Sequence, residues 1–180
     1  MNRRVSHARG RTSRLVADEE ERERRRAFVH EHRTAIFGYS RKHDGPSMSV
    51  VYYVMNGEDG ILVSTMRDRS KAKAAVAHPK VSLCILDEQW PLTYLQVYCT
   101  AEVDSDLNRA TDMMMRVSAV MAGKEMPESA RTEVEEMCRR EHRVVLRLSP
   151  YATFQTPPRH VHEADDLKGL THWTSSSMPW

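Results

Sequence analysis

Short apolar runs separated by tight-turn sequences limit the folds open to residues 34–66. Three runs, TAIFGYS (34–40), SMSVVYYVM (47–55) and GILVSTM (60–66), are rich in Val, Ile, Tyr and Phe. The segments between them, KHDGP (42–46) and NGEDG (56–60), contain Asp-Gly and Asn-Gly pairs, which favour the turns of β-hairpins. The pattern therefore predicts three antiparallel strands connected as a meander.

Three further strands are predicted downstream, at KVSLCILD (80–87), TYLQVYCTAEVD (93–104) and HRVVLRLSPYATFQT (142–156). In the second of them Leu95, Val97 and Cys99 fall on every other position, as expected for a strand with one buried face. Pro150 lies inside the third segment, where we expect it to break the strand or to place it at a sheet edge, because proline has no N–H for the ladder.

Helical patterns flank these strands. ADEEERERRRAFVHEHR (17–33) has acidic residues first and arginines later, which predicts a surface helix ending near His32. Residues 1–14 before it are basic with little apolar content, and we expect a flexible arm. RDRSKAKAAVAHP (67–79) predicts a short alanine-rich helix capped by Asp68 or Ser70.

Two more helices are predicted at 105–121 and 127–142, the second with Pro127 in its first turn. The tail at 157–180, rich in Ser, His and Pro, is expected to be irregular. Because strands outnumber helices and consecutive strands pair through short turns, the predicted fold is mainly β, an antiparallel barrel or sandwich with peripheral helices.

Charge and cysteine usage exclude several classes of protein. The 180 residues carry a formal net charge of only +2, which gives no general nucleic-acid footprint. Cys84, Cys99 and Cys138 lie far apart without a CxxC pair, which indicates reduced thiols in the cytoplasm. The basic start is followed by no signal-like apolar run, and no segment approaches the length of a membrane span, so we expect a soluble protein.

Motifs for the commoner catalytic sites are missing from the sequence. It has no P-loop, no G-x-G-x-x-G and no G-x-S-x-G, which excludes the usual Walker, Rossmann and nucleophile-elbow sites. Histidines form two H-x-H pairs, His30/His32 and His160/His162, but no third ligand has a metal-binding spacing, so surface or structural histidines are favoured and no metal is expected.

The stretch STMRDRSKAKAA (64–75) concentrates positive charge where a predicted strand meets a predicted helix. Arg67, Arg69, Lys71 and Lys73 fall within seven positions. A helix start offers unpaired N–H groups and the positive end of the helix dipole, so these cations could hold an anion such as a phosphate. A solvated charged turn is the alternative, and the residues alone slightly favour it.

The order of these elements resembles the split-barrel superfamily of pyridoxamine-phosphate-oxidase-like proteins, in particular its branch that uses the deazaflavin cofactor F420. The segments that carry the resemblance are KHDGPSMSVVYYVMNGEDGILVSTMRDRSKAKAAVAHPKVSLCILDE (42–88) and YCTAEVD (98–104). The resemblance covers roughly residues 27–156. It divides the chain into an arm and surface helix at 1–26, a barrel at 27–156 and a tail at 157–180.

The resemblance implies a six-stranded antiparallel split β-barrel with peripheral helices. It also implies a cytoplasmic homodimer with a cofactor in the groove between the two copies. The cofactor phosphate would be held by Arg69 and Lys71, with help from Arg67 and Lys73. The ring would pack against Ser64 and Thr65 and against the strand that carries Ser47, Met48, Ser49 and Val50. Trp90 and the C-terminal segment of the partner would complete the pocket.

The implied activity is hydride transfer between F420 and a small conjugated organic substrate, and no side chain is selected as a catalytic acid. FMN is the alternative cofactor within the fold. Arginines that hold the substrate phosphate in pyridoxamine-phosphate oxidases have no counterpart here, which disfavours vitamin B6 oxidation.

A non-catalytic flavin- or haem-binding split barrel is a further alternative. The candidate iron ligands would then be His30, His142, His160 and His162. A nucleic-acid-associated protein using the basic arm is disfavoured by the nearly neutral whole chain.

Overall fold

The computed structural model describes residues 5–89, 92–156 and 175–180, with side chains from residue 18 onward. Its elements in chain order are α1 (Val5–Glu31), β1 (Thr34–Tyr39), β2 (Ser47–Asn56), β3 (Gly60–Met66), α2 (Ser70–Ala77), β4 (Lys80–Asp87), β5 (Thr93–Asp104), α3 (Leu107–Ala122), the short 3-10 turn η1 (Glu128–Ala130), α4 (Arg131–Arg140), β6 (Arg143–Gln155) and β7 (Ser176–Pro179). All six strands expected between residues 34 and 156 are present.

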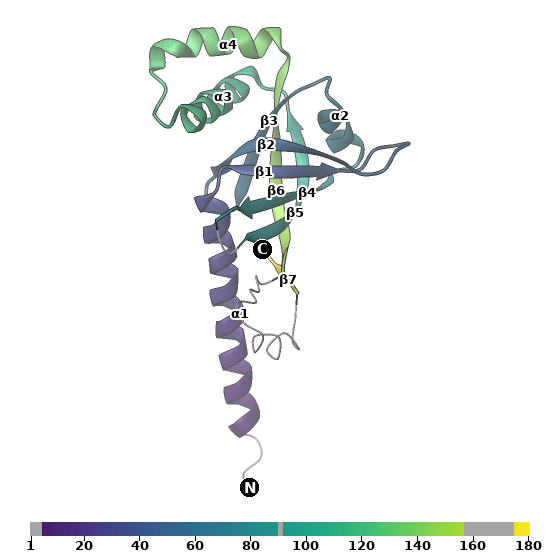
Figure 1. Ribbon diagram of the computed structural model, residues 1–180, viewed down its shortest axis with the longest axis vertical. Helices are drawn as coiled ribbons and strands as arrows, with labels where there is room; N and C mark the ends of the chain where they lie inside the picture. Colours follow the sequence, from purple (N-terminus) through teal and green to yellow (C-terminus); the bar gives the residue numbers. More distant parts are fainter. Residues whose placement is uncertain (1–4, 90–91, 157–174) are drawn as a thin grey trace.

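Six of the strands close into an antiparallel barrel. The sheet order is β3-β2-β1-β4-β5-β6, with β7 on the outside of β6, and β3 also pairs with β6 to complete the circle. Figure 1 shows α3 and α4 together on one side of the barrel, while α1 extends away from the other. This confirms the split barrel with peripheral helices.

Alternation along the strands fills the barrel, as the sequence predicts. Leu95, Val97 and Cys99 are fully buried in the main core, together with Phe37 and Leu83 from neighbouring strands. A second apolar cluster lies outside the barrel, where Met113 and Val117 of α3 pack on Val145 of β6. Burial raises the pKa of the Cys99 thiol to about 12, which makes it a structural residue.

Pro150 does not break β6, contrary to one of the two expectations. Tyr98 pairs with Ala152 and Cys99 pairs with Pro150, so Tyr151 is the extra residue of a β-bulge. Pro150 also lies between the part of β6 that pairs with β3 and the part that pairs with β7. The missing N–H therefore falls beside the bulge and at a position where the other edge of β6 has no paired strand among the described residues, and the strand continues.

The described parts of the two chain ends are more regular than expected. Helix α1 begins at Val5, so most of the expected flexible arm is helical, although its end at Glu31 is close to the expected His32. The described end of the expected irregular tail forms β7, which pairs with β6 from Ala152 to Gln155.

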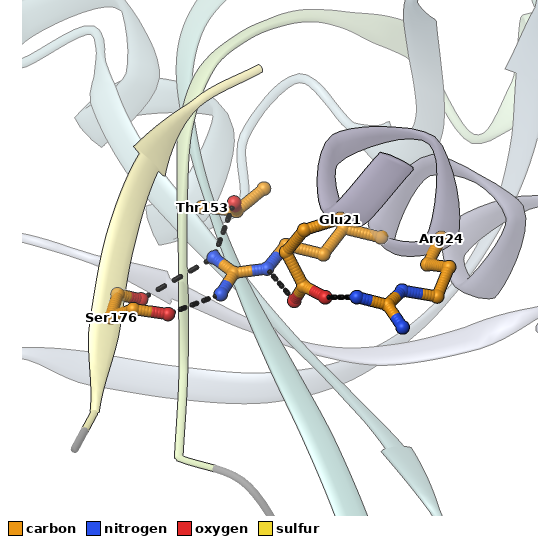
Figure 2. A network of polar contacts seen from close by, with 5 residues as sticks. Glu21, Arg24, Thr153 and Ser176 are labelled. Carbon is orange, nitrogen blue, oxygen red and sulfur yellow. Dashed lines mark hydrogen bonds and ion pairs between the residues drawn. The ribbon is translucent and has the colours of Figure 1, made fainter. Parts of the chain in front are cut away.

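A buried arginine on α1 explains why β7 docks. Arg25 is only 3% exposed. Its Nη1 donates to Thr153 Oγ1 at 3.0 Å, and its Nη2 donates to Ser176 Oγ at 2.6 Å. Its Nε donates to Glu21 Oε1 at 2.9 Å, which balances the charge (Figure 2). One guanidinium therefore connects α1, β6 and β7.

Trp180 adds a second anchor at the same end. Its indole N–H donates to Asp59 Oδ1 at 2.8 Å, and its backbone amide donates to Tyr151 O at 3.2 Å. The Arg26 guanidinium lies 5.7 Å from the centre of the Trp180 ring, within the range of a cation–π contact.

Candidate functional site

Helix α2 packs against the barrel and carries the cation-rich stretch. Ala72 and Ala75 face the barrel and are buried, and their small side chains allow the helix to approach the strands closely. The residue at the N-cap position is Arg69, and its side chain makes no capping hydrogen bond, so the expected cap by Asp68 or Ser70 is wrong. Arg69 thus lies just before the helix, and Lys71 lies in its first turn.

Lys71 is the one cation of the stretch that is not exposed. Its Nζ lies 6.0 Å from the centre of the ring of Phe37, a fully buried residue on β1. Burial lowers the pKa of the Lys71 ammonium, and the nearby charge of Arg69 lowers this pKa further. Among the described residues, no carboxylate forms an ion pair with Lys71. A half-buried cation with another cation beside it is stabilised by an anion.

Ser49 lies on β2, next to the strand that carries Phe37. It stands directly opposite Phe37 in the pairing of β1 and β2. Its Oγ is buried and has no hydrogen-bond partner within the described part of the chain. Ser49 therefore shares the inward face of the sheet with Phe37, whereas its neighbour Val50 points to the outer surface, so a ligand on one face of β2 meets only one of the two side chains.

The other three cations of the stretch are placed differently. Lys73 Nζ lies 3.9 Å from Asp68 Oδ1, and both side chains are exposed. Arg67 is exposed, and its backbone amide donates to His142 O at 2.9 Å, which fixes the turn between β3 and α2. Arg69 is exposed beside Lys71, so Arg69 and Lys71 are the pair best placed at the helix start.

Ser64 and Thr65, both expected to line the cofactor ring, lie on opposite faces of β3. The Thr65 side chain is 4% exposed and is among the buried polar residues. Ser64 is partly exposed, and its Oγ accepts a hydrogen bond of 3.5 Å from Arg143 Nη1. A ligand on one face of β3 therefore meets only one of the two side chains.

The outer surface of β2 is unusually apolar. Met48 and Val50 are 71% and 73% exposed, and Ile36 on β1 stands directly opposite Val50. A cavity of about 430 Å³ next to Val50 is lined by residues of β1 and by Leu86 and Glu88. Exposed apolar patches of this kind mark interaction surfaces. Ser47 is partly exposed at the start of the same strand. Trp90, expected in the pocket, lies outside the described residues.

A basic cavity lies beside α2, and it was not predicted from the sequence. The loop between β1 and β2 contributes Arg41, Lys42 and His43, and α2 contributes Lys73. The cavity measures about 370 Å³, and Arg41 is paired with Asp44 of the same loop at 2.8 Å. The letters RKHD show the charge, but only the folded chain shows that the hairpin reaches α2.

Two of the described histidines contact backbone carbonyls through their rings. His30 Nε2 lies 3.1 Å from Glu58 O, and His32 Nδ1 lies 2.7 Å from Phe28 O. His142 adopts a positive φ of 52° at the start of β6. No group of three potential metal ligands occurs within the described ranges, and His160 and His162 lie outside them.

No helix in the described part of the chain is both long and apolar enough to cross a bilayer. The three cysteines are free thiols.

Comparison with known proteins gives one family match and several structural matches. The family model described as pyridoxamine 5'-phosphate oxidase matches residues 21–155. No curated protein matches the sequence. A conserved hypothetical protein from Mycobacterium tuberculosis has 18% identity and a TM-score of 0.63, covering 78% of this chain and 91% of that one.

Two other solved structures share the fold at similar distance. A protein named F420 reductase has 16% identity and a TM-score of 0.53, covering 67% of this chain and 88% of its own. A pyridoxamine 5'-phosphate oxidase-type protein from Listeria innocua has 14% identity and a TM-score of 0.52, covering 71% and 90%. At these identities the structures show a shared fold.

Proposed function

The chain belongs to the pyridoxamine 5'-phosphate oxidase family, and from this premise we propose that it is an F420-dependent reductase. It would transfer a hydride between the deazaflavin and a small conjugated organic molecule. The observation that carries the proposal is Lys71, a half-buried cation beside Arg69 that has no carboxylate partner among the described residues. The family includes oxidoreductases, and one structural neighbour is named F420 reductase.

The residues around α2 fit the phosphate of such a cofactor. Arg69 offers a guanidinium fork at the N-cap position, and Lys71 offers a point charge in the first turn. The ring would lie along the outer surface of β2, against Val50. The bound deazaflavin supplies the hydride chemistry, while the protein orients the ring, excludes water and holds the phosphate.

The basic cavity beside α2 favours F420 over FMN. F420 carries an acidic glutamate tail beyond its phosphate, whereas FMN ends at the phosphate. Arg41, Lys42 and Lys73 line a cavity that begins on the same helix as Lys71, so an acidic tail could enter it.

We also propose that two copies pair through the apolar surface of β1, β2 and β4, centred on Val50 and Ile36. This places the cofactor groove at the contact between the copies, where Trp90 and the C-terminal segment can contribute. The free thiols suit a cytoplasmic location.

The test is direct binding of F420 and FMN to the purified protein, followed by absorbance. The double variant Arg69→Ala/Lys71→Ala should weaken F420 binding by at least tenfold, because each lost charge-assisted contact costs about 1.5–3 kcal/mol. The matched control is Arg140→Ala/Lys124→Ala, which removes the same charges from exposed positions on α4 and after α3. If both double variants bind F420 as the wild type does, the phosphate site is elsewhere.

Turnover is tested by following oxidation of reduced F420 with a panel of enones and quinones. A protein that binds F420 but oxidises it with none of them is a cofactor-binding protein and not a reductase. A protein that copurifies with FMN or haem and does not bind F420 contradicts the cofactor assignment.

A further inference from the structure

A second cavity lies between α3 and the outer surface of the barrel. It measures about 310 Å³ and shares no lining residue with the site at α2. Its floor is apolar and is formed by Leu62 of β3, Val145 of β6 and Met113 of α3. This volume is at the lower end of the range of small-molecule sites, and an apolar floor with a few polar groups is their usual lining.

Three arginines stand around this floor. Arg109 and Arg116 come from α3, seven residues apart and therefore on one side of the helix, and Arg147 comes from β6. Asp104 and Asp112 also reach the cavity. Asp112 is engaged outside it, because its Oδ1 lies 2.6 Å from Arg131 Nη2, at the start of α4.

Asp104 fixes one arginine and neutralises it. Its side chain is 6% exposed, and its Oδ1 accepts a hydrogen bond of 2.9 Å from Arg109 Nη2, while Arg109 Nε contacts Oδ2. The hydrogen bond from Arg109 is the main reason that the pKa of Asp104 is lowered. The amide of Asp106 also donates to Asp104 Oδ1, at 3.0 Å. This pair therefore forms a rigid and nearly neutral edge of the cavity.

Arg116 and Arg147 keep most of their charge for a ligand. Arg147 Nη1 lies 4.0 Å from Asp104 Oδ2, which is too long for a hydrogen bond, and its side chain is 50% exposed. Glu102 stands opposite Arg147 in the strand pairing but forms no ion pair with it in the described structure. Arg116 uses Nη2 to bind the carbonyl of Met55, which leaves its other N–H groups available.

We propose that this cavity is a binding site for a small organic carboxylate with an apolar body. Two guanidinium groups from different elements can share one carboxylate, and the apolar body covers Leu62, Met113 and Val145. An inorganic anion would satisfy the arginines but would leave the apolar floor in contact with water. The site is independent of the cofactor and binds its ligand in the cofactor-free protein.

The probe is 2-naphthoate, and binding is followed by its fluorescence and by the amide resonances of α3 and β6. Its neutral isostere 2-naphthamide has the same ring system without the charge. We expect saturable binding of 2-naphthoate, with shifts concentrated around Met113 and Val145. Binding of 2-naphthamide should be roughly tenfold weaker or more, because it forms no charge-assisted hydrogen bond.

Arg147→Gln is the main variant, since the side chain is half exposed and its loss should not affect folding. It should weaken 2-naphthoate binding roughly tenfold. Arg140→Gln is the matched control, because Arg140 is an exposed arginine on α4 that does not line the cavity. The double variant Arg69→Ala/Lys71→Ala should bind 2-naphthoate as the wild type does, which separates this site from the one at α2.

Results of three kinds would each overturn the proposal. The first is the absence of saturable 2-naphthoate binding to the wild type. The second is equal affinity for the acid and the amide, or equal effects of Arg147→Gln and Arg140→Gln. The third is loss of binding in Arg69→Ala/Lys71→Ala, which would place the carboxylate at α2.

Discussion

At the scale of single residues, Lys71 is in an environment that is costly for a cation. It is partly withdrawn from water, its Nζ lies 6.0 Å from the centre of the Phe37 ring, and the positive charge of Arg69 lowers its pKa further. Such an arrangement lowers stability unless a ligand compensates for it, and this is common at functional sites.

The substitution Lys71→Met should raise the melting temperature of the ligand-free protein by about 1–2 °C, since it removes a half-buried charge that solvent still screens in part. The same substitution should weaken F420 binding roughly tenfold, because it removes a charged contact to the phosphate. Thermal denaturation and a binding titration measure the two effects. A lower melting temperature without ligand would show that Lys71 has a stabilising partner.

The effect of Lys71→Met on stability should depend on pH in a defined direction. The pKa of Lys71 is lower in the folded protein than in the unfolded chain. Between these two pKa values the unfolded state binds more protons, so the stability of the folded state increases as pH rises. The advantage of Lys71→Met should therefore be greatest below the folded pKa and should shrink at alkaline pH.

At the scale of elements, the strands could be predicted from sequence and the contacts between distant elements could not. Alternation around Leu95 and Val97 is a local pattern, and so is the Asp-Gly turn after β1. The docking of β7 depends on Arg25, which lies 128 positions before Thr153 and among several similar arginines. Nothing local distinguishes it from the exposed Arg24.

In the candidate site, too, local features could be predicted from the sequence and long-range contacts could not. The cation cluster and the helix start are visible in residues 64–75, and the structure puts Arg69 at the N-cap position of α2 and Lys71 in its first turn. The unmatched Ser49 hydroxyl and the basic hairpin beside α2 depend on long-range packing. Ser64 and Thr65 are adjacent in sequence, and strand geometry alone puts them on opposite faces.

The prediction that belongs to the elements concerns the Arg25 network. Arg25→Met should lower the free energy of unfolding by about 2–4 kcal/mol, because it leaves the buried Thr153 hydroxyl without its arginine donor and removes the contacts of α1 with Ser176 of β7. Arg24→Met is the matched control, since Arg24 contacts the same Glu21 but its side chain is 74% exposed. Its effect should be below about 1 kcal/mol. Urea unfolding compares the two, and equal losses would contradict a special role for Arg25.

At the scale of the whole molecule, an apolar surface of the barrel has no helix over it within the described part of the chain. Met48 and Val50 project from β2 on this surface, beside Ile36 and Leu86. Helix α2 also carries an apolar residue of similar exposure, Val76, which is 71% exposed. The two positions differ in their surroundings, since Val50 is part of a continuous sheet surface.

Val50→Glu should therefore convert the proposed homodimer into a monomer, because a carboxylate in the centre of an apolar contact would be desolvated without a partner. Val76→Glu adds the same charge to α2 and should leave the dimer intact. Light scattering after size-exclusion chromatography gives the mass of each. A monomeric wild type, or a dimeric Val50→Glu variant, would rule out this surface as the contact.

The lowered pKa of Lys71 also gives the site a chemical reactivity of its own. An amine with a depressed pKa keeps a larger neutral fraction at a given pH, and the neutral amine is the nucleophile. Aldehydes and activated esters would therefore modify Lys71 ahead of lysines with ordinary pKa values that lie fully in water. A bound phosphate would protect it, so covalent labelling becomes a footprint of occupancy that requires neither the substrate nor turnover.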